Sequence, residues 1–262
     1  MRTMTFSLLA LLLCSLHGAA QTVDFECQLA KAACVAQWDA DGDGELSFEE
    51  LAAVTTLDKA LSKNKRITSF DELSYFTSLR TIGPQAFFDD FQLRHVTIPP
   101  SVDTIGEAAF WSCIRLDDIT IPKTVKVLRR NCFYHCTKLQ RVEIPSSIDT
   151  IPERAFMWCE ALREVNVRNG VRVIEAEAFA QCQKMEHVLL PASLTFIGND
   201  AFGIPCSVRQ IQVSATTPPA VSGKPFSTYV LQNATLLVPE GTLDAYRQAP
   251  GWCDFIYVCE MF

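Results

Sequence analysis

One pattern of hydrophobic and polar positions recurs every 23 residues through most of the chain. Each step carries an Ala-Phe pair, with Cys132 replacing the Ala once, and three further aliphatic columns keep the same phase. The Phe column consists of Phe87, Phe110, Phe133, Phe156, Phe179 and Phe202. One aliphatic column consists of Ile82, Ile105, Leu128, Ile151, Ile174 and Ile197. A fixed period of this length predicts a solenoid, whose units bury their apolar residues by stacking.

Every unit contains a short segment such as "LDDITIP", from Leu116 to Pro122. Its apolar residues stand at the first, fourth and sixth positions, which fits a strand with one buried face. Stacked copies would form a parallel sheet with strands about 4.8 Å apart. A proline often follows the segment, and proline ends a strand because it cannot donate to the ladder. We therefore predict a repeat solenoid whose first wall is this sheet, with the Phe column filling its middle.

The longest clear copy of the pattern is "IPPSVDTIGEAAFWSCIRLDDITIP", from Ile98 to Pro122. It resembles the BspA-like, Treponema-type leucine-rich repeats of bacterial surface proteins, over roughly residues 67–240. The resemblance implies a right-handed leucine-rich-repeat solenoid, or horseshoe, with a parallel sheet. Members of this family are typically exported, and several are linked to adhesion or host-protein binding. The fold transfers with the resemblance, whereas the ligand does not.

The sequence divides into four parts. Residues 1–20 have a basic start, an apolar run and small residues at the end, which predicts a secretory signal cleaved near Ala20. Residues 21–62 form an EF-hand-like helix-loop-helix, residues 63–240 the leucine-rich-repeat solenoid, and residues 241–262 a C-terminal cap. Near the end, "LVP" from Leu237 to Pro239 has slipped by two residues from the repeat phase.

Charge and hydropathy narrow the choice of partner and location. The chain holds 23 basic and 30 acidic residues, for a formal net charge of −7. An acidic chain without a basic stripe is a poor nucleic-acid binder, because affinity there depends on neutralising phosphates. No segment after the signal is long and apolar enough to span a membrane. We expect a secreted, periplasmic or cell-surface protein that is a monomer.

The stretch "DADGDGELSFEE", from Asp39 to Glu50, has the spacing of an EF-hand calcium loop. Such a loop supplies oxygen ligands at positions 1, 3, 5, 7, 9 and 12, and it turns at a glycine in position 6. The predicted calcium ligands are Asp39, Asp41, Asp43, Glu45 through its backbone, Ser47 through a water, and Glu50. Gly44 stands at position 6, and helical sequence flanks the loop over Phe25 to Trp38 and Phe48 to Leu61.

The loop has no usable second copy. A dockerin, which binds cohesin in cell-surface assemblies, would need one, and the nearest candidate is "LSKNKRITSFDE". That segment places Leu61, Lys63 and Lys65 at positions 1, 3 and 5, where they cannot bind calcium. We therefore interpret the loop as a structural calcium clamp that fixes the two helices against the first repeat. A dockerin-like assembly module is the alternative.

Four cysteines share one column of the repeat: Cys113, Cys136, Cys159 and Cys182. Neighbours in a parallel column have Cβ atoms about 5 Å apart, farther than the roughly 3.8 Å that a disulfide prefers. They are predicted to be reduced thiols in the core. The disulfide states of Cys27, Cys34, Cys253 and Cys259 stay open.

The sequence offers little for catalysis. It has no Gly-rich phosphate loop and no nucleophile elbow, and His135 beside Cys136 lacks a second pair of metal ligands. We therefore predict a protein that is not an enzyme. The exposed strand positions vary while the buried columns stay fixed, which favours a concave surface that binds a protein ligand. That predicted surface comprises His95, Asp118, Arg141, Glu143, Glu164, Asn166, His187 and Gln210.

Overall fold

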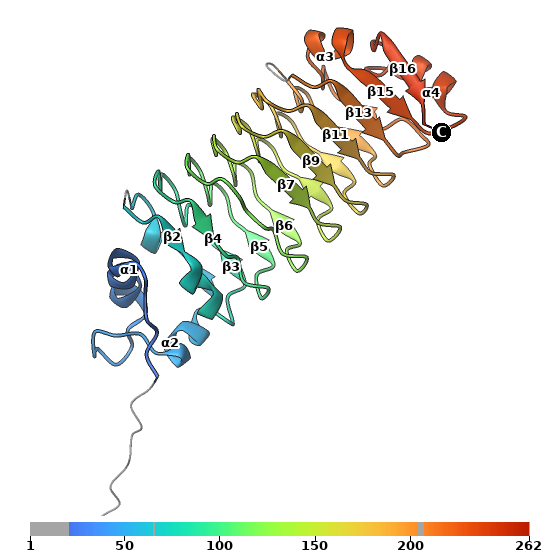
Figure 1. Ribbon diagram of the computed structural model, residues 1–262. Coiled ribbons are helices and arrows are strands. Elements are labelled where there is room, and N and C mark those ends of the chain that lie inside the picture. The colour runs from blue at the N-terminus through green and yellow to red at the C-terminus, as the bar shows by residue number, and fades with distance from the viewer. Residues whose placement is uncertain (1–20, 65, 204–206, 262) are drawn as a thin grey trace, which may run out of the picture.

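The computed structural model describes residues 21–64, 66–203 and 207–261. The predicted signal over residues 1–20 lies outside these described residues. The chain begins with two helices, α1 (Gln28–Trp38) and α2 (Phe48–Ala53), and then winds into an elongated solenoid (Figure 1). Two 3₁₀ helices, η1 (Lys59–Leu61) and η2 (Asp71–Tyr75), belong to its first turns, and α3 (Thr228–Asn233) and α4 (Leu243–Gln248) to its last.

Parallel strands build two walls of the solenoid, and most coils contribute one strand to each wall. The first wall contains β2 (Ser69–Phe70), β4 (His95–Val96), β7 (Arg141–Ile144), β9 (Glu164–Val167), β11 (His187–Leu190), β13 (Gln210–Val213), β15 (Thr235–Val238) and β16 (Tyr257–Glu260). The second wall contains β1 (Thr56–Leu57), β3 (Thr81–Ile82), β5 (Thr104–Ile105), β6 (Val127–Leu128), β8 (Thr150–Ile151), β10 (Val173–Ile174), β12 (Phe196–Ile197) and β14 (Ala220–Val221). These strands confirm the predicted parallel-sheet solenoid.

The pairing register follows the sequence repeat. Arg141 pairs with Glu164, which is a step of 23 residues (164 − 141). Gln210 pairs with Thr235, a step of 25 residues (235 − 210), so the register itself absorbs the slip of two residues seen in the sequence. The apolar positions of each strand point inward and the polar positions outward, as in β7, where Val142 and Ile144 are buried.

Stacked phenylalanine rings fill the interior. The six rings of the repeat column are fully buried, and Phe226 continues the series. Neighbouring ring centroids lie 4.9 Å apart between Phe87 and Phe110 and 5.4 Å apart between Phe179 and Phe202, with planes tilted by 7° and 11°. The rings thus repeat at nearly the spacing of strands in a sheet, about 4.8 Å. We call the turns that carry these rings the third wall.

The third wall uses left-handed backbone at residues other than glycine. Two residues in most coils have a positive φ: Gln85, Ala108, Asn131, Arg154, Glu177 and Asp200 in one column, and Asp89, Ser112, His135, Trp158 and Gln181 in the other. Such a conformation costs about 1–2 kcal/mol for a residue with a Cβ. It turns each N–H toward the next coil, where the Gln85 N–H donates to the Glu107 carbonyl at 2.9 Å. The inter-coil hydrogen bond therefore offsets the local strain.

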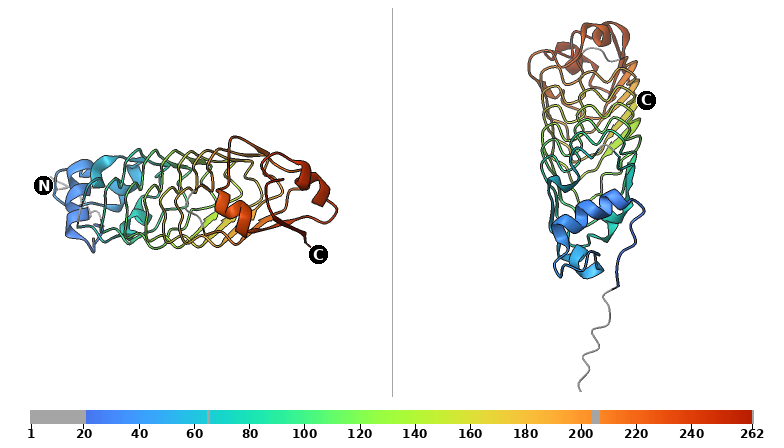
Figure 2. Two further views of the ribbon diagram at one scale, coloured as in Figure 1. Left: turned by 90° about the horizontal axis from the view of Figure 1, so that it is seen from above. Right: turned by 90° about the vertical axis from the view of Figure 1, so that its left-hand side faces the viewer.

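Each end of the solenoid is covered. At the N-terminal end α1 lies across the first coils (Figure 2), where Trp38 packs edge-on against Phe76 with centroids 5.3 Å apart. The second helical flank was predicted to reach Leu61, but α2 ends at Ala53. The β-branched run from Val54 to Thr56 disfavours helix, and Thr56 begins the second wall instead.

The C-terminal end is closed by aromatic residues and by one more strand. The Tyr246 hydroxyl donates to the Ala215 carbonyl at 2.7 Å, and Trp252 Nε1 donates to the Pro219 carbonyl at 2.8 Å. Trp252 and Phe255 pack edge-on against Phe226, the last ring of the stack. β16 pairs with β15 and extends the first wall, a strand that the repeat pattern did not predict.

Both sheets are interrupted at one boundary between coils, and the first wall is also interrupted one coil earlier. The segment 117–121 was predicted as a strand, yet it joins neither β4 nor β7, and Asp117 and Asp118 are poor strand formers. In the second wall the sheet that ends at β6 does not continue to β8. We call this boundary, between residues 117–131 and residues 140–154, the seam.

Pro152 accounts for the break in the second wall. In neighbouring coils the Arg129 N–H donates to the Ile105 carbonyl, and the Glu175 N–H to the Ile151 carbonyl, both at 2.9 Å. Pro152 occupies the equivalent position and has no N–H to donate. The third wall continues across the seam, because the Phe133 N–H donates to the Ala155 carbonyl at 2.9 Å.

Replacing Gln85 tests the left-handed column. We expect Gln85→Gly to be about 1 kcal/mol more stable than Gln85→Ala, because only glycine adopts a φ of +60° without strain. At Lys126, an exposed residue that also donates between coils but lacks a positive φ, the order should reverse by about 0.5–1 kcal/mol. Urea unfolding of the four variants measures both differences, and the same order at both positions would contradict the assignment.

Candidate functional site: the acidic loop and the strand face

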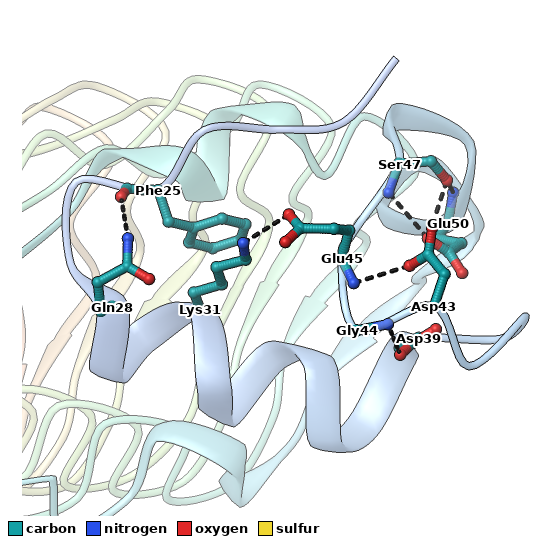
Figure 3. Close-up of polar contacts among 9 residues, drawn as sticks. All are labelled: Phe25, Gln28, Lys31, Asp39, Asp43, Gly44, Glu45, Ser47 and Glu50. Atoms are coloured by element: carbon teal, nitrogen blue, oxygen red, sulfur yellow. Dashed lines mark hydrogen bonds and ion pairs between the residues drawn. The ribbon is translucent and has the colours of Figure 1, made fainter. Parts of the chain in front are cut away.

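The acidic loop between α1 and α2 gathers three carboxylates. Oxygens of Asp39, Asp41 and Asp43 all lie within 4.8 Å of one another. Asp39 holds the loop by accepting from the Gly42 N–H at 2.7 Å. It also accepts from the Gly44 N–H at 2.9 Å (Figure 3). Both glycines have a positive φ, of 76° and 85°, which the tight turn requires.

Glu50 ties the end of the loop to its start. It forms a capping box with Ser47 at the beginning of α2, and its other oxygen accepts from the Ala40 N–H at 2.7 Å. Hydrogen bonds from the Ser47 and Ala40 backbones lower the pKa of Glu50, because they favour its charged form. The Glu50 carboxylate thus lies at the loop, but it is not one of the three clustered groups.

The donor set suits a hard divalent cation. Aspartate oxygens, a backbone carbonyl and a glutamate are the ligands that Ca²⁺ prefers. Of the predicted set, Glu45 donates its N–H to Asp43 at 2.7 Å, and its side chain pairs with Lys31 of α1 (Figure 3). The Ser47 hydroxyl donates to Glu50 at 2.9 Å. The structure therefore brings three predicted ligands together and holds the others in the same loop.

The loop pairs with the chain's own N-terminal segment. Thr22 and Ser47 form an antiparallel bridge, the Val23 N–H donates to the Leu46 carbonyl at 2.8 Å, and the Phe48 N–H to the Gln21 carbonyl at 3.3 Å. Val23 and Leu46 are buried. Sequence reasoning did not include residues 21–23 in the site, although the apolar alternation of Val23 and Phe25 is the signal that would have found them.

The strand face is the outward surface of the first wall. Register pairs place Arg141 beside Glu164, Glu164 beside His187, and His187 beside Gln210. Glu143 and Asn166 form the adjacent pair of the next column. The seam separates these six from the remaining predicted residues, His95 on β4 and Asp118 on segment 117–121. The predicted surface is therefore divided, because the sheet that should carry it is interrupted.

Two residues of the predicted surface have partners within the chain. His95 Nδ1 lies 2.7 Å from the Asp71 carboxylate of η2. Glu143 forms a two-bond ion pair with Arg168, with Nε–Oε1 and Nη2–Oε2 both 3.0 Å, and this guanidinium lowers the pKa of Glu143. Toward the C-terminus the same columns lose their charge and end in Tyr257 and Cys259.

A crevice opens in the strand face at the seam. Its volume is about 350 Å³. Charged side chains of both signs line it: Asp118, Lys123, Arg141 and Glu143. Its apolar lining comes from Ile119, Ile121 and Val142, with Pro122 and Pro145. The strand face is thus hollowed at the boundary between its two parts.

An aromatic row on the third wall was missed by sequence reasoning. Phe88, Trp111 and Tyr134 follow the repeat Phe by one residue, and that fixed offset is the signal that could have found them. Their rings stack with centroids 5.9 Å and 3.9 Å apart. Because the faces contact one another, the row presents ring edges outward and does not offer an open platform for a sugar.

The cysteine column has a hydrogen-bonding role. Cys113 Sγ donates to the Phe87 carbonyl at 3.1 Å, and Cys136 Sγ to the Phe110 carbonyl at 3.2 Å. Cys159 and Cys182 repeat the contact at 3.3 Å. Burial raises the pKa of Cys113 and Cys136 well above the ordinary value, so these thiols keep the proton that they donate. Cys253 and Cys259, by contrast, are exposed at the C-terminal end.

Asp90 occupies the same column and is fully buried. Its Oδ1 accepts from the Asn64 N–H at 2.7 Å, and its Oδ2 has no hydrogen-bond partner among the described residues. Burial raises the pKa of Asp90 to about 8, with a smaller contribution from the nearby charge of Asp89. At neutral pH the folded protein therefore holds Asp90 largely as the neutral acid.

We expect stability to fall as pH rises between about 4 and 8. The unfolded chain releases the Asp90 proton near 3.8, whereas the folded chain keeps it up to about 8, so folding binds a proton throughout this window. Asp90→Asn should remove this slope and be more stable than the wild type at pH 8.5. Thermal unfolding from pH 5 to 8.5 measures it, with Asp149→Asn as the exposed control. An unchanged slope in Asp90→Asn would contradict the assignment.

The coils, with their sheet strands and buried phenylalanine turns, define a leucine-rich-repeat solenoid. The chain belongs to the family described as BspA type leucine rich repeat region, whose profile matches six copies over residues 65–214. Within the described residues, no helix is long and apolar enough to cross a membrane.

Two solved structures share the fold. One is a leucine-rich repeat protein from Bacteroides ovatus, with 19% sequence identity and a TM-score of 0.53 over 79% of this chain. This chain spans 64% of that protein's length. The other is the T. pallidum leucine-rich repeat protein TpLRR, with 22% identity and a TM-score of 0.51, covering 66% of this chain and 77% of that one. No curated protein sequence matches the chain.

Proposed function

We propose that this protein recognises another protein outside the cell, with the strand face as the binding surface and a calcium clamp at its N-terminal end. The observation that carries the proposal is the row of exposed, chemically varied side chains in register on β7, β9 and β11. Arg141, Glu164 and His187 are exposed on strands whose inward residues are uniformly apolar. A partner can therefore select on these side chains without affecting the core.

Binding fits this surface better than catalysis. The two histidines of the first column, His95 and His187, stand four coils apart, about 19 Å at the usual strand spacing. They cannot act on one substrate atom. The charged groups between them alternate in sign, which disfavours a polyanion such as nucleic acid and suits the mixed surface of a protein.

Export is supported by the composition of residues 1–20, which have a basic start and an apolar run. A cell-surface or secreted location is the natural setting for recognition of a host matrix or envelope protein. The pairing of the acidic loop with residues 21–23 favours a structural clamp over a dockerin-like module. The backbone groups of the loop at Leu46 and Phe48 already bond to this N-terminal segment.

Calcium would serve the first coils in this proposal. Three carboxylates within 4.8 Å repel one another, and a divalent ion would convert that repulsion into attraction. The loop connects α1, which lies across the open end of the solenoid, with α2, which leads into β1. A calcium ion that fixed the loop would therefore also hold α1 over the open end of the phenylalanine stack.

Alanine substitution on the strand face tests the binding role. The triple variant Arg141→Ala, Glu164→Ala and His187→Ala should lose at least tenfold in affinity for a partner isolated from host matrix or envelope extracts. The matched control replaces Lys126, Arg172 and Gln183, which are exposed on other walls. Thermal midpoints should stay within about 2 °C, because exposed substitutions rarely change stability. Equal binding by both triple variants, measured by surface plasmon resonance, would refute this surface.

Chelation and a charge deletion test the clamp. At about 100 times its Kd, calcium should stabilise the wild type by about 2.7 kcal/mol, which corresponds to a rise in Tm of about 5–10 °C. Asp41→Asn keeps an oxygen that can accept from the Asp43 N–H but removes one charge. It should lose most of this rise and, in EDTA, be at least as stable as the wild type.

Asp24→Asn, an exposed change outside the loop, should behave like the wild type in both conditions. Differential scanning fluorimetry with calcium or EDTA gives the midpoints. A wild-type Tm that does not move in excess EDTA would rule out the clamp.

A further inference from the structure

We infer that the seam is a docking site for an extended peptide, which adds a strand to the open edge of β7. This inference rests on the proposed function, since it names a partner class for part of the strand face. The seam is built by residues 117–131 and 140–154, and its crevice is lined by Asp118, Lys123, Arg141 and Glu143.

Main-chain groups at the seam lack the partners that they have elsewhere. β7 is the last strand of the six-stranded sheet, so only its β9 side is paired. Across the seam the bond from the Gln140 N–H to the Asp117 carbonyl is 3.4 Å long, whereas the equivalent bond from Arg163 to Gln140 is 3.0 Å. In the described part of the chain, no other backbone bond joins segment 117–121 to either neighbouring strand.

The observed bonds identify which groups of β7 are open. The Ile144 carbonyl points toward β9, because it accepts from the Arg168 N–H at 3.0 Å. Successive peptide groups along a strand point to opposite sides. The N–H and C=O groups of Arg141 and Glu143 therefore face the seam, spaced as a parallel or antiparallel strand requires.

An extended polypeptide is the occupant that fits these groups. An unpaired strand edge is a template for another strand, and β-augmentation supplies the main-chain donors and acceptors that it lacks. Two acidic and two basic side chains line the crevice, so its formal charge cancels and does not select a polyanion. Ile119 and Val142 add apolar lining, which suits a strand with apolar residues at alternate positions.

The third wall allows the seam to widen without breaking the solenoid. There the His135 N–H donates to the Met157 carbonyl at 2.8 Å, and the Phe133 and Phe156 rings stack 5.2 Å apart. The second wall is held less tightly at this point, because Pro152 lacks the donor that Glu175 supplies one coil later. A side-chain bond from the Ser147 hydroxyl to the Val125 carbonyl, at 2.6 Å, still crosses it. The coils can therefore part on the strand side and stay joined at the phenylalanine turns.

Closing the seam tests the inference. Pro152→Glu restores an N–H opposite the Leu128 carbonyl and copies the residue of the next coil, Glu175. We expect hydrogen exchange at the Arg141 and Glu143 amides to slow and Tm to rise. Pro250→Glu, an exposed change in the C-terminal cap, should alter neither.

Random twelve-residue peptides displayed on phage are the probe. A peptide enriched on the wild type, then synthesised, should bind the wild type and Pro250→Glu equally and Pro152→Glu at least tenfold more weakly by fluorescence anisotropy. It should slow exchange at the Arg141 and Glu143 amides. N-methylation of its alternate amides on one edge should also weaken binding at least tenfold, a test that does not depend on the Pro152 variant.

Three results would overturn the inference: no enriched peptide, exchange protection away from the seam, or binding insensitive to N-methylation. The proposed function would survive them if the alanine triple variant still lost its protein partner. If the alanine triple variant still bound both its protein partner and the peptide, that result would instead count against the strand face as a whole.

Discussion

The match between two repeat distances governs this structure. Phenylalanine rings stack 4.9–5.4 Å apart along the repeat column, and strands in a sheet lie about 4.8 Å apart. Because the two distances nearly agree, one coil after another can hydrogen-bond and stack at once. The left-handed residues follow from the same constraint, since they aim the N–H groups of the third wall at the next coil. No coil could bury its phenylalanine alone.

Because the inward residues hold the coils together, the outward residues of the strand face are free to vary. Inward positions of the first wall are aliphatic in every strand from β7 to β15, whereas outward positions include arginine, glutamate, histidine and glutamine. At the ends the stack needs covers with other chemistry. Trp38 and α1 provide one, and Tyr246 and Trp252 the other. The acidic loop belongs to the first of these covers, which is why a clamp there would act on the solenoid.

Much of the fold could be predicted from the sequence because each buried column repeats in phase. The strands, the filling role of the phenylalanines and the slip before β15 all follow from spacing. The seam did not, since the consequence of Pro152 depends on which N–H groups bond between coils. The pairing of Ser47 with Thr22 and the buried acid at Asp90 were equally hidden, because each depends on contacts between segments. For the acidic loop, spacing predicted the cluster of Asp39, Asp41 and Asp43, whereas occupancy by calcium stays a proposal.

The seam also affects how the protein unfolds. In a linear array each unit is stabilised only by its neighbours, so the weakest interface divides the chain into cooperative blocks. Here two of three walls lack most of their backbone hydrogen bonds at one boundary, where the long bond from Gln140 to Asp117 and the bond from the Ser147 hydroxyl to the Val125 carbonyl remain beside the phenylalanine turns. The coils up to residue 131 and those from Gln140 onward are thus two folding units on one continuous ring stack. Loss of order in one need not spread to the other.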